Sequence, residues 1–193
     1  MGMTVGDKSG NPVVLSHSSS DPCFSLGVNI PAAQFTAGVL LSFTGAAGFV
    51  TRIKWIRLVL RSGTTASTSQ QVTLERRSTA TTGGAVTAVT PGKHDSVNDT
   101  TAQQTTVTAY FNATPVAPTP GTLVATLRSE PLPPLAATVA DTTNSVLEWN
   151  FTTRGDKPPT LRGTSDFITL SLSASLSTAQ NLQVQFEMEE STT

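Results

Sequence analysis

Two segments near the end of the chain alternate apolar and polar residues. In 167–173 the apolar positions alternate with Ser and Thr, and in 181–189 they alternate with Asn, Gln and Glu. A period of two is typical of strands with one buried and one solvated face. The break between them, Ala174–Gln180, has no helical period, so the pair is predicted to form an antiparallel hairpin. Its inner face is expected to hold Ile168, Leu170, Leu172, Leu182, Val184, Phe186 and Met188, and its outer face Gln183, Gln185, Glu187 and Glu189.

Further short strands are predicted upstream, and they bring the total to about nine. They are separated by Gly, Pro, Ser and Thr turns, and no segment of helical length has a 3.6-residue period. The predicted strands are Phe24–Ile30, Phe35–Phe43, Val50–Arg61, Gln70–Arg77, Thr105–Phe111, Leu123–Leu127 and Val146–Phe151.

The longest of them, Val50–Arg61, is predicted to be central. Strict alternation places Lys54 on one face with the apolar residues Ile56, Leu58 and Leu60. The other face is then expected to hold Ile53, Trp55, Arg57, Val59 and Arg61. Since both faces are partly apolar, the strand is expected to be covered on both sides.

Many short strands without helices indicate an all-β fold, a single β-sandwich over residues 24–193. The strand order is open between immunoglobulin-like and jelly-roll topologies, although the Cys and Trp spacing of an immunoglobulin domain is absent. Residues 1–23 are rich in Gly, Ser, Asn and Pro and are predicted to form an extended N-terminal arm. Ser78–Gln104, low in large apolar residues, is predicted to be a functional projection or a segment without fixed structure.

Composition narrows the classes of partner. Only 13% of residues are charged and the formal net charge is −1, so nothing favours binding to nucleic acid or to an anionic membrane. The single cysteine, Cys23, excludes an intrachain disulfide. The N-terminus has no secretory signal and no apolar run could cross a bilayer, so synthesis in a cytoplasm is expected.

Candidate chemistry is sparse. His94 and Asp95 lie in the long polar segment, where solvation accounts for them better than catalysis or metal binding. Glu148 and Glu187 lie on polar faces, where a carboxylate needs no special role. We therefore predict no catalytic residue, no cofactor and no metal site. Arg57 and Arg61 are expected to pair with acidic residues of neighbouring strands or subunits.

Several segments resemble small β-rich virion proteins of tailed bacteriophages. The resemblance covers about the last three quarters of the chain and rests on strand and turn patterns. The segments are 53–58, 72–77, Lys93-His94-Asp95-Ser96, 121–128, 147–151, 159–164 and the final alternating strand. The resemblance implies a jelly-roll-like body and the role of a capsid decoration or cement protein, which is often a trimer. Other proteins of similar composition belong to tails or fibres.

The expectation is a non-enzymatic phage protein, made in the host bacterial cytoplasm, that binds the major capsid protein on the capsid exterior as a homotrimer. The arm is expected to contact the capsid through Val13, Val14, Leu15 and His17, with Ser78–Gln104 as the second choice. Subunit contacts are expected at Arg57, Arg61, Glu187 and Glu189. The alternative is a receptor- or glycan-binding module of a phage tail or fibre, using Trp55, Trp149 or Tyr110, although their place in strands favours core packing.

Overall fold

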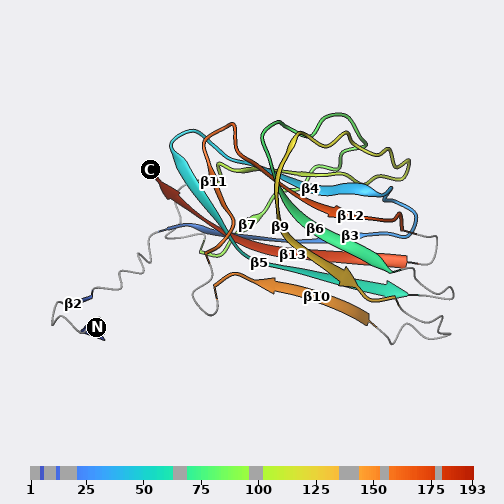
Figure 1. Cartoon of the computed structure of the whole chain (residues 1–193), viewed down its shortest axis with the longest axis horizontal. Coiled ribbons are helices and arrows are strands. Elements are labelled where there is room, and N and C mark those ends of the chain that lie inside the picture. Colours follow the sequence, from blue (N-terminus) through green and yellow to red (C-terminus); the bar gives the residue numbers. More distant parts are fainter. Residues whose placement is uncertain are drawn as a thin grey trace.

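The protein is an all-β sandwich of two antiparallel sheets in a computed structural model (Figure 1). The structure describes residues 21–62, 69–95, 102–134, 144–152, 157–176 and 180–193, together with two short paired strands, β1 (Val5–Gly6) and β2 (Pro12–Val13). Within these ranges all nine predicted strands are present. No described segment forms a helix that could span a bilayer.

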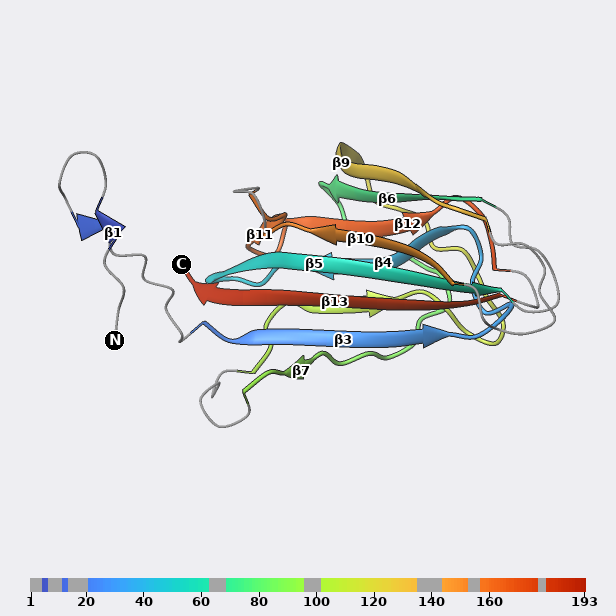
Figure 2. The same cartoon turned by 90° about the horizontal axis from the view of Figure 1, so that it is seen from below.

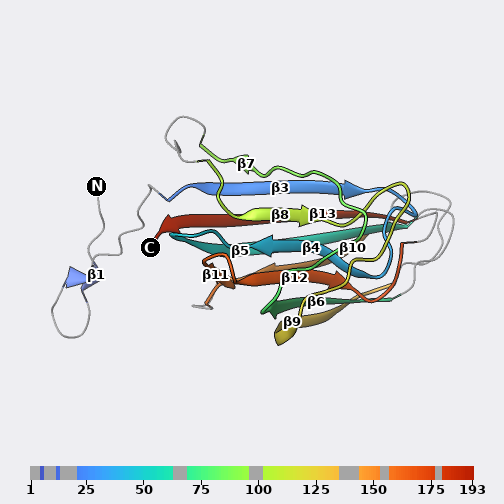
Figure 3. The same cartoon turned by 90° about the horizontal axis from the view of Figure 1, so that it is seen from above.

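The first sheet has the strand order β10-β5-β13-β3-β7, with β11 also paired to β5 (Figure 2). Its strands are β3 (Cys23–Ile30), β5 (Phe49–Ser62), β7 (Gly92–Lys93), β10 (Asn144–Asn150), β11 (Thr160–Arg162) and β13 (Gln180–Thr192). The second sheet has the order β8-β4-β12-β6-β9 (Figure 3). Its strands are β4 (Gly38–Thr44), β6 (Gln70–Arg77), β8 (Thr106–Ala109), β9 (Leu123–Leu132) and β12 (Phe167–Leu172).

The pairing is nested, which defines a jelly roll. The first body strand pairs with the last, β3 with β13, and inside that pair β4 joins β12, β5 joins β10 and β6 joins β9. The four pairs therefore form one long antiparallel ribbon that is rolled up, so that alternate pairs fall in opposite sheets. The jelly-roll prediction is confirmed, and immunoglobulin-like topology is excluded.

The core lies between the sheets and is formed by the alternating residues of both. Each of the seven inner-face residues predicted for the C-terminal strands is at most 2% exposed. Phe43 of β4 meets Phe186 of β13 edge to face, with ring centroids 4.9 Å apart. This contact joins the two sheets across the core. Such aromatic pairs stabilise a fold by about 0.5–1.5 kcal/mol beyond the effect of burying their surface.

The predicted C-terminal hairpin is wrong. β12 pairs with β4 and β6 in the second sheet, whereas β13 lies between β3 and β5 in the first. Alternation specifies which side of a strand is buried but not which strand lies beside it. Both strands turn their apolar sides to the same core from opposite sheets, so their pattern is the one a hairpin would have.

The described parts of Ser78–Gln104 lie along the body rather than projecting from it. Backbone hydrogen bonds join Thr82 to Thr119, Thr87 to Ala109 and His94 to Cys23. Residues 78–95 therefore have fixed structure, contrary to the second alternative of the prediction, and residues 96–101 lie outside the described residues.

Glu190 fastens the end of this segment to β13. Its side chain is completely buried, and its carboxylate accepts hydrogen bonds from the backbone N–H groups of Gln104 (2.9 Å) and Thr105 (2.7 Å). A buried carboxylate is tolerated where backbone donors of this kind satisfy its oxygens.

The first body strand begins at Cys23, the last residue of the predicted arm. Pro22 is already part of the body, because its carbonyl accepts a hydrogen bond from the Glu190 N–H at 3.0 Å. Of the predicted capsid contacts, Val13 belongs to β2, and Val14, Leu15 and His17 lie outside the described residues.

Candidate functional site

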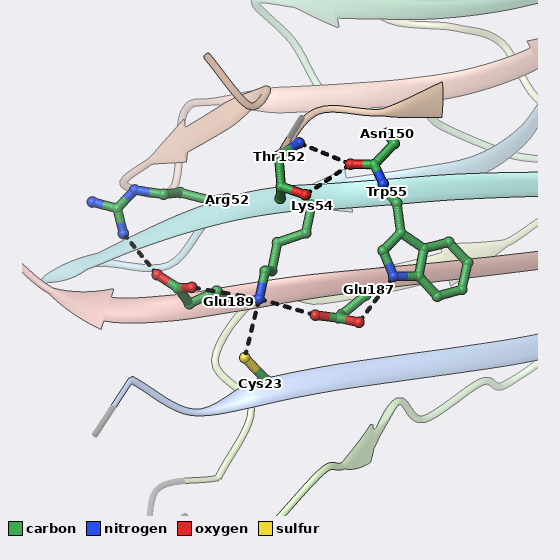
Figure 4. Close-up of polar contacts among 8 residues, drawn as sticks. All are labelled: Cys23, Arg52, Lys54, Trp55, Asn150, Thr152, Glu187 and Glu189. Carbon is green, nitrogen blue, oxygen red and sulfur yellow. Dashed lines mark hydrogen bonds and ion pairs between the residues drawn. The ribbon is translucent and has the colours of Figure 1, made fainter. Parts of the chain in front are cut away.

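A β-bulge in β5 decides which side chains reach the outer face of the first sheet. Glu187 of β13 pairs with Trp55, but the next residue, Met188, pairs with Ile53, so Lys54 is an extra residue on β5. Ile53 and Ile56 are both fully buried on either side of it. Lys54 and Trp55 consequently both point away from the core (Figure 4).

The prediction that Lys54 and Trp55 lie on opposite faces is therefore wrong. The bulge shifts the alternation by one position, which is a common way for a sheet to redirect a side chain. The sequence does carry a signal of the shift, because the buried Ile53 and Ile56 are three residues apart rather than two. The outer face is also less covered than predicted, since Arg57 and Arg61 are exposed and Trp55 is partly exposed.

We call this outer surface of β10, β5, β13 and β3 around Trp55 the Trp55 face. An ion-pair chain crosses it from strand to strand (Figure 4). The Lys54 ammonium lies 3.1 Å from Glu187 Oε1 and 3.9 Å from Glu189 Oε2, and the Arg52 guanidinium lies 3.5 Å from Glu189 Oε1. These side chains are partly exposed, so each pair contributes at most about 1 kcal/mol. These ion pairs therefore contribute more to the orientation of the side chains than to the stability of the fold.

The pKa values of the central pair shift in the directions that keep both charges. Burial raises the Glu187 pKa, but hydrogen bonds from Trp55 and Lys54 and the charge of Lys54 outweigh it, and the pKa falls below its ordinary value. Burial lowers the Lys54 pKa, but the hydrogen bond to Glu187, together with the electrostatic effects of Cys23, Glu187 and Glu189, outweighs it and raises the pKa. The pair is thus fully ionised at neutral pH.

Trp55 is held by the same carboxylate. Its indole Nε1 donates a hydrogen bond to Glu187 Oε2 at 2.9 Å. In Figure 4 the ring is seen face-on over the outer side of the sheet. The other two aromatic candidates are core residues, because Trp149 is 4% exposed and Tyr110 is 6% exposed.

Two shallow pockets adjoin the indole, one on each side of Gln185. The first has a volume of about 220 Å³ and is lined by Trp55, Arg57, Glu148, Asn150 and Gln185. The second has a volume of about 250 Å³ and is lined by Ser25, Leu26, Gly27, Trp55, His94, Gln185 and Glu187. An aromatic side chain with polar groups at its margin can hold a small ligand by stacking and hydrogen bonding.

The predicted subunit contacts fall largely on this face. Glu187 and Glu189 pair with Lys54 and Arg52 of the same chain, and Arg57 lies 3.8 Å from Glu148 of β10. Arg61 is exposed near the end of β5. Contact with a neighbouring subunit remains a prediction for all four residues.

A second surface with unusual exposure lies where β9 and β10 meet at the edges of the two sheets (Figure 1). Most of β9 is exposed, including Leu123 (50%) and Val124 (57%). We call it the β9–β10 side. Sequence reasoning missed it, because an exposed edge strand and a buried strand can have the same apolar content.

The β9–β10 side also contains a cavity with a volume of about 420 Å³. Arg128 lies over the Phe151 ring, 5.7 Å from its centroid, in a cation–π contact. The cavity is lined by Arg76, Leu127, Arg128, Phe151, Lys157, Pro158, Pro159 and Thr160. Phe151 itself is 2% exposed, so this side presents Arg128 beside the exposed aliphatic residues of β9, and arginine is enriched in protein–protein contacts.

Within the described ranges, no group of three or more His, Cys, Asp or Glu side chains could hold a metal ion. No protein-family model matches the chain, and no curated protein is similar to it in sequence.

Proposed function

We propose that the protein is a structural component of a tailed-phage virion, a decoration protein that binds the outer capsid surface and stabilises contacts between capsid subunits. The proposal starts from the resemblance of its strand and turn segments to such proteins. The jelly roll supports it, because viral capsid domains often have this architecture, although the fold also occurs in lectins.

The β9–β10 side is the observation that carries the proposal. An edge strand with exposed aliphatic residues presents unpaired backbone groups to another chain, and soluble monomers rarely leave such a strand uncovered. We assign this side, rather than the predicted Arg57, Arg61, Glu187 and Glu189, to the contact between protomers of a homotrimer, because three of those four side chains already pair within the chain. In a decoration role, binding to assembled shells alone would stabilise the assembled state by mass action.

The arm is assigned to the major capsid protein, because it precedes the body and its two described strands, β1 and β2, pair with each other rather than with a described strand of the body. A variant without residues 1–20 keeps Pro22 and all of β3, so its melting temperature should match that of the full chain. We expect it to lose co-sedimentation with capsids that lack the protein. Undiminished capsid binding by the folded variant would contradict this assignment.

Electron cryo-microscopy of the intact particle tests the location directly. We expect copies of the jelly roll on the outer capsid surface, each group of three related by a threefold axis. Light scattering of the purified protein should give three times the 20.1-kDa chain mass. Density at the tail alone would contradict the decoration role.

Such a location would instead support the alternative, a receptor- or glycan-binding module of a tail or fibre. Trp55 favours this second function, because it is the predicted candidate that the structure leaves partly exposed, beside two polar pockets.

A further inference from the structure

Trp55 presents its indole ring to solvent in a fixed orientation. The hydrogen bond to Glu187 holds the ring, and the ion pair with Lys54 holds Glu187 in turn. Because the ring is oriented before any ligand arrives, binding loses little side-chain entropy. A tryptophan required only for packing would be buried, as Trp149 is.

The groups around the ring are mainly neutral hydrogen-bonding groups. Asn150 and Gln185 contribute amides, Ser25 a hydroxyl and His94 an imidazole. Asn150 is itself positioned, since its Oδ1 accepts hydrogen bonds from the Thr152 N–H (3.0 Å) and hydroxyl (2.7 Å). An aromatic plane with amides at its margin suits a ligand that has a flat C–H face and several hydroxyl groups.

The charges on the Trp55 face cancel locally. Glu187 is paired with Lys54, and Glu148 lies near Arg57. A polyanion such as nucleic acid would need a surplus of basic groups, which these pairs do not provide. The balance favours an uncharged ligand.

We infer that the Trp55 face binds a neutral saccharide, with one sugar ring stacked on the indole of Trp55 and its hydroxyl groups hydrogen-bonded by Asn150 and Gln185. The two pockets allow the neighbouring sugar units to extend to either side, over Glu148 or toward Gly27. This inference deepens the alternative receptor- or glycan-binding function and rests on it, but it does not depend on the protein's location in the virion.

Gly27 provides a variant that blocks the site without altering Trp55. It lies on β3 opposite Gln185, is exposed, and a Cβ added there would meet only Gln185 Cγ, at 3.9 Å. Gly27→Val should therefore fold, since valine favours strands, while its side chain fills the second pocket. Asn29→Ala, two residues further along the exposed side of β3, is the matched control.

The test is a printed array of neutral, sialylated and sulfated oligosaccharides, probed with the full-length protein. The strongest neutral oligosaccharide is then titrated in solution and followed by isothermal titration calorimetry, which also reports on the Trp55→Ala variant. We expect saturable binding that weakens at least about tenfold in Trp55→Ala and in Gly27→Val, because aromatic contacts at the centre of a site dominate its affinity. Asn29→Ala should bind as the unchanged protein does.

Binding restricted to acidic oligosaccharides, absence of binding to any neutral one, or full affinity in the folded Gly27→Val and Trp55→Ala variants would overturn the inference. Each of these outcomes leaves the decoration role standing, because that role is tested by location. Binding of a neutral saccharide by a protein that microscopy places on the capsid would support the inference and contradict only the tail position.

Discussion

Glu190→Gln should destabilise the protein through its effect on two backbone donors. The carboxylate accepts one hydrogen bond at each oxygen, from the N–H groups of Gln104 and Thr105. Glutamine has the same shape but only one oxygen, so its NH₂ group would face one of these N–H donors. Thr105 is buried, so water does not readily replace a bond lost there.

The loss can be estimated from these contacts. A hydrogen bond to a charged group contributes about 1.5–3 kcal/mol, so losing one should lower the free energy of unfolding by about 2 kcal/mol. For a protein of this length that corresponds to a fall in melting temperature of about 4–8 °C.

Thermal unfolding monitored by circular dichroism measures the change, and amide hydrogen exchange at Thr105 shows whether the effect is local. Glu189→Gln is a close control, because the neighbouring side chain lies on the solvent side of β13 and its ion pairs are partly exposed. It should lower stability by less than about 1 kcal/mol. Equal destabilisation by both variants would refute the role assigned to the buried carboxylate.

Three further outcomes are expected. Burial raises the pKa of Glu187, but the hydrogen bonds from Trp55 and Lys54 and the charge of Lys54 lower it below its ordinary value in the folded state. The stabilisation by this carboxylate is therefore present above its ordinary pKa and lost as pH falls through the lowered folded-state pKa. The stability advantage over Glu187→Gln should shrink on acidification, and a constant difference in acid melting curves would contradict this. Gly121→Ala should lower the free energy of unfolding by at least about 2 kcal/mol, because the new Cβ would lie 1.8 Å from the Thr79 carbonyl oxygen. At Gly92 a new Cβ would lie 3.9 Å from the nearest atom, so Gly92→Ala is the control and should be nearly neutral. Denaturant unfolding of both variants measures the difference. Val124→Asp should dissociate the proposed trimer without unfolding the protomer, as measured by light scattering. Val86 is similarly exposed, so Val86→Asp is the control and should leave the trimer intact. An intact trimer in the Val124→Asp variant would contradict a subunit contact at β9.

Most strands and their buried faces were predictable, because a strand with one buried side alternates apolar and polar residues along the sequence. Leu182, Val184, Phe186 and Met188 are all core residues, as the alternation indicates. The partner of β13 was not predictable, because its neighbours β3 and β5 are far away in the sequence and are selected by the rolled topology. The alternation of apolar and polar residues shows which side of a strand is buried. It does not show which strand lies beside it, because backbone hydrogen bonds do not depend on residue type.

The Trp55 face was only partly predictable. Trp55 was one of three aromatic candidates, and strict alternation placed Lys54 on the opposite side of the sheet. One extra residue in β5 brings the two together and lets Glu187 hold both. The phase shift between Ile53 and Ile56 is visible in the sequence, but its meaning depends on which residues of β13 lie opposite.

The nested pairing has a consequence for synthesis of the chain. β13 lies between β3 and β5, so the first sheet lacks a central strand until β13 has been made. Before then β3 and β5 have edges that β13 later covers, and these edges can associate with other nascent chains. The first sheet therefore cannot be completed until β13 is available, and the many contacts between distant segments should make folding slow.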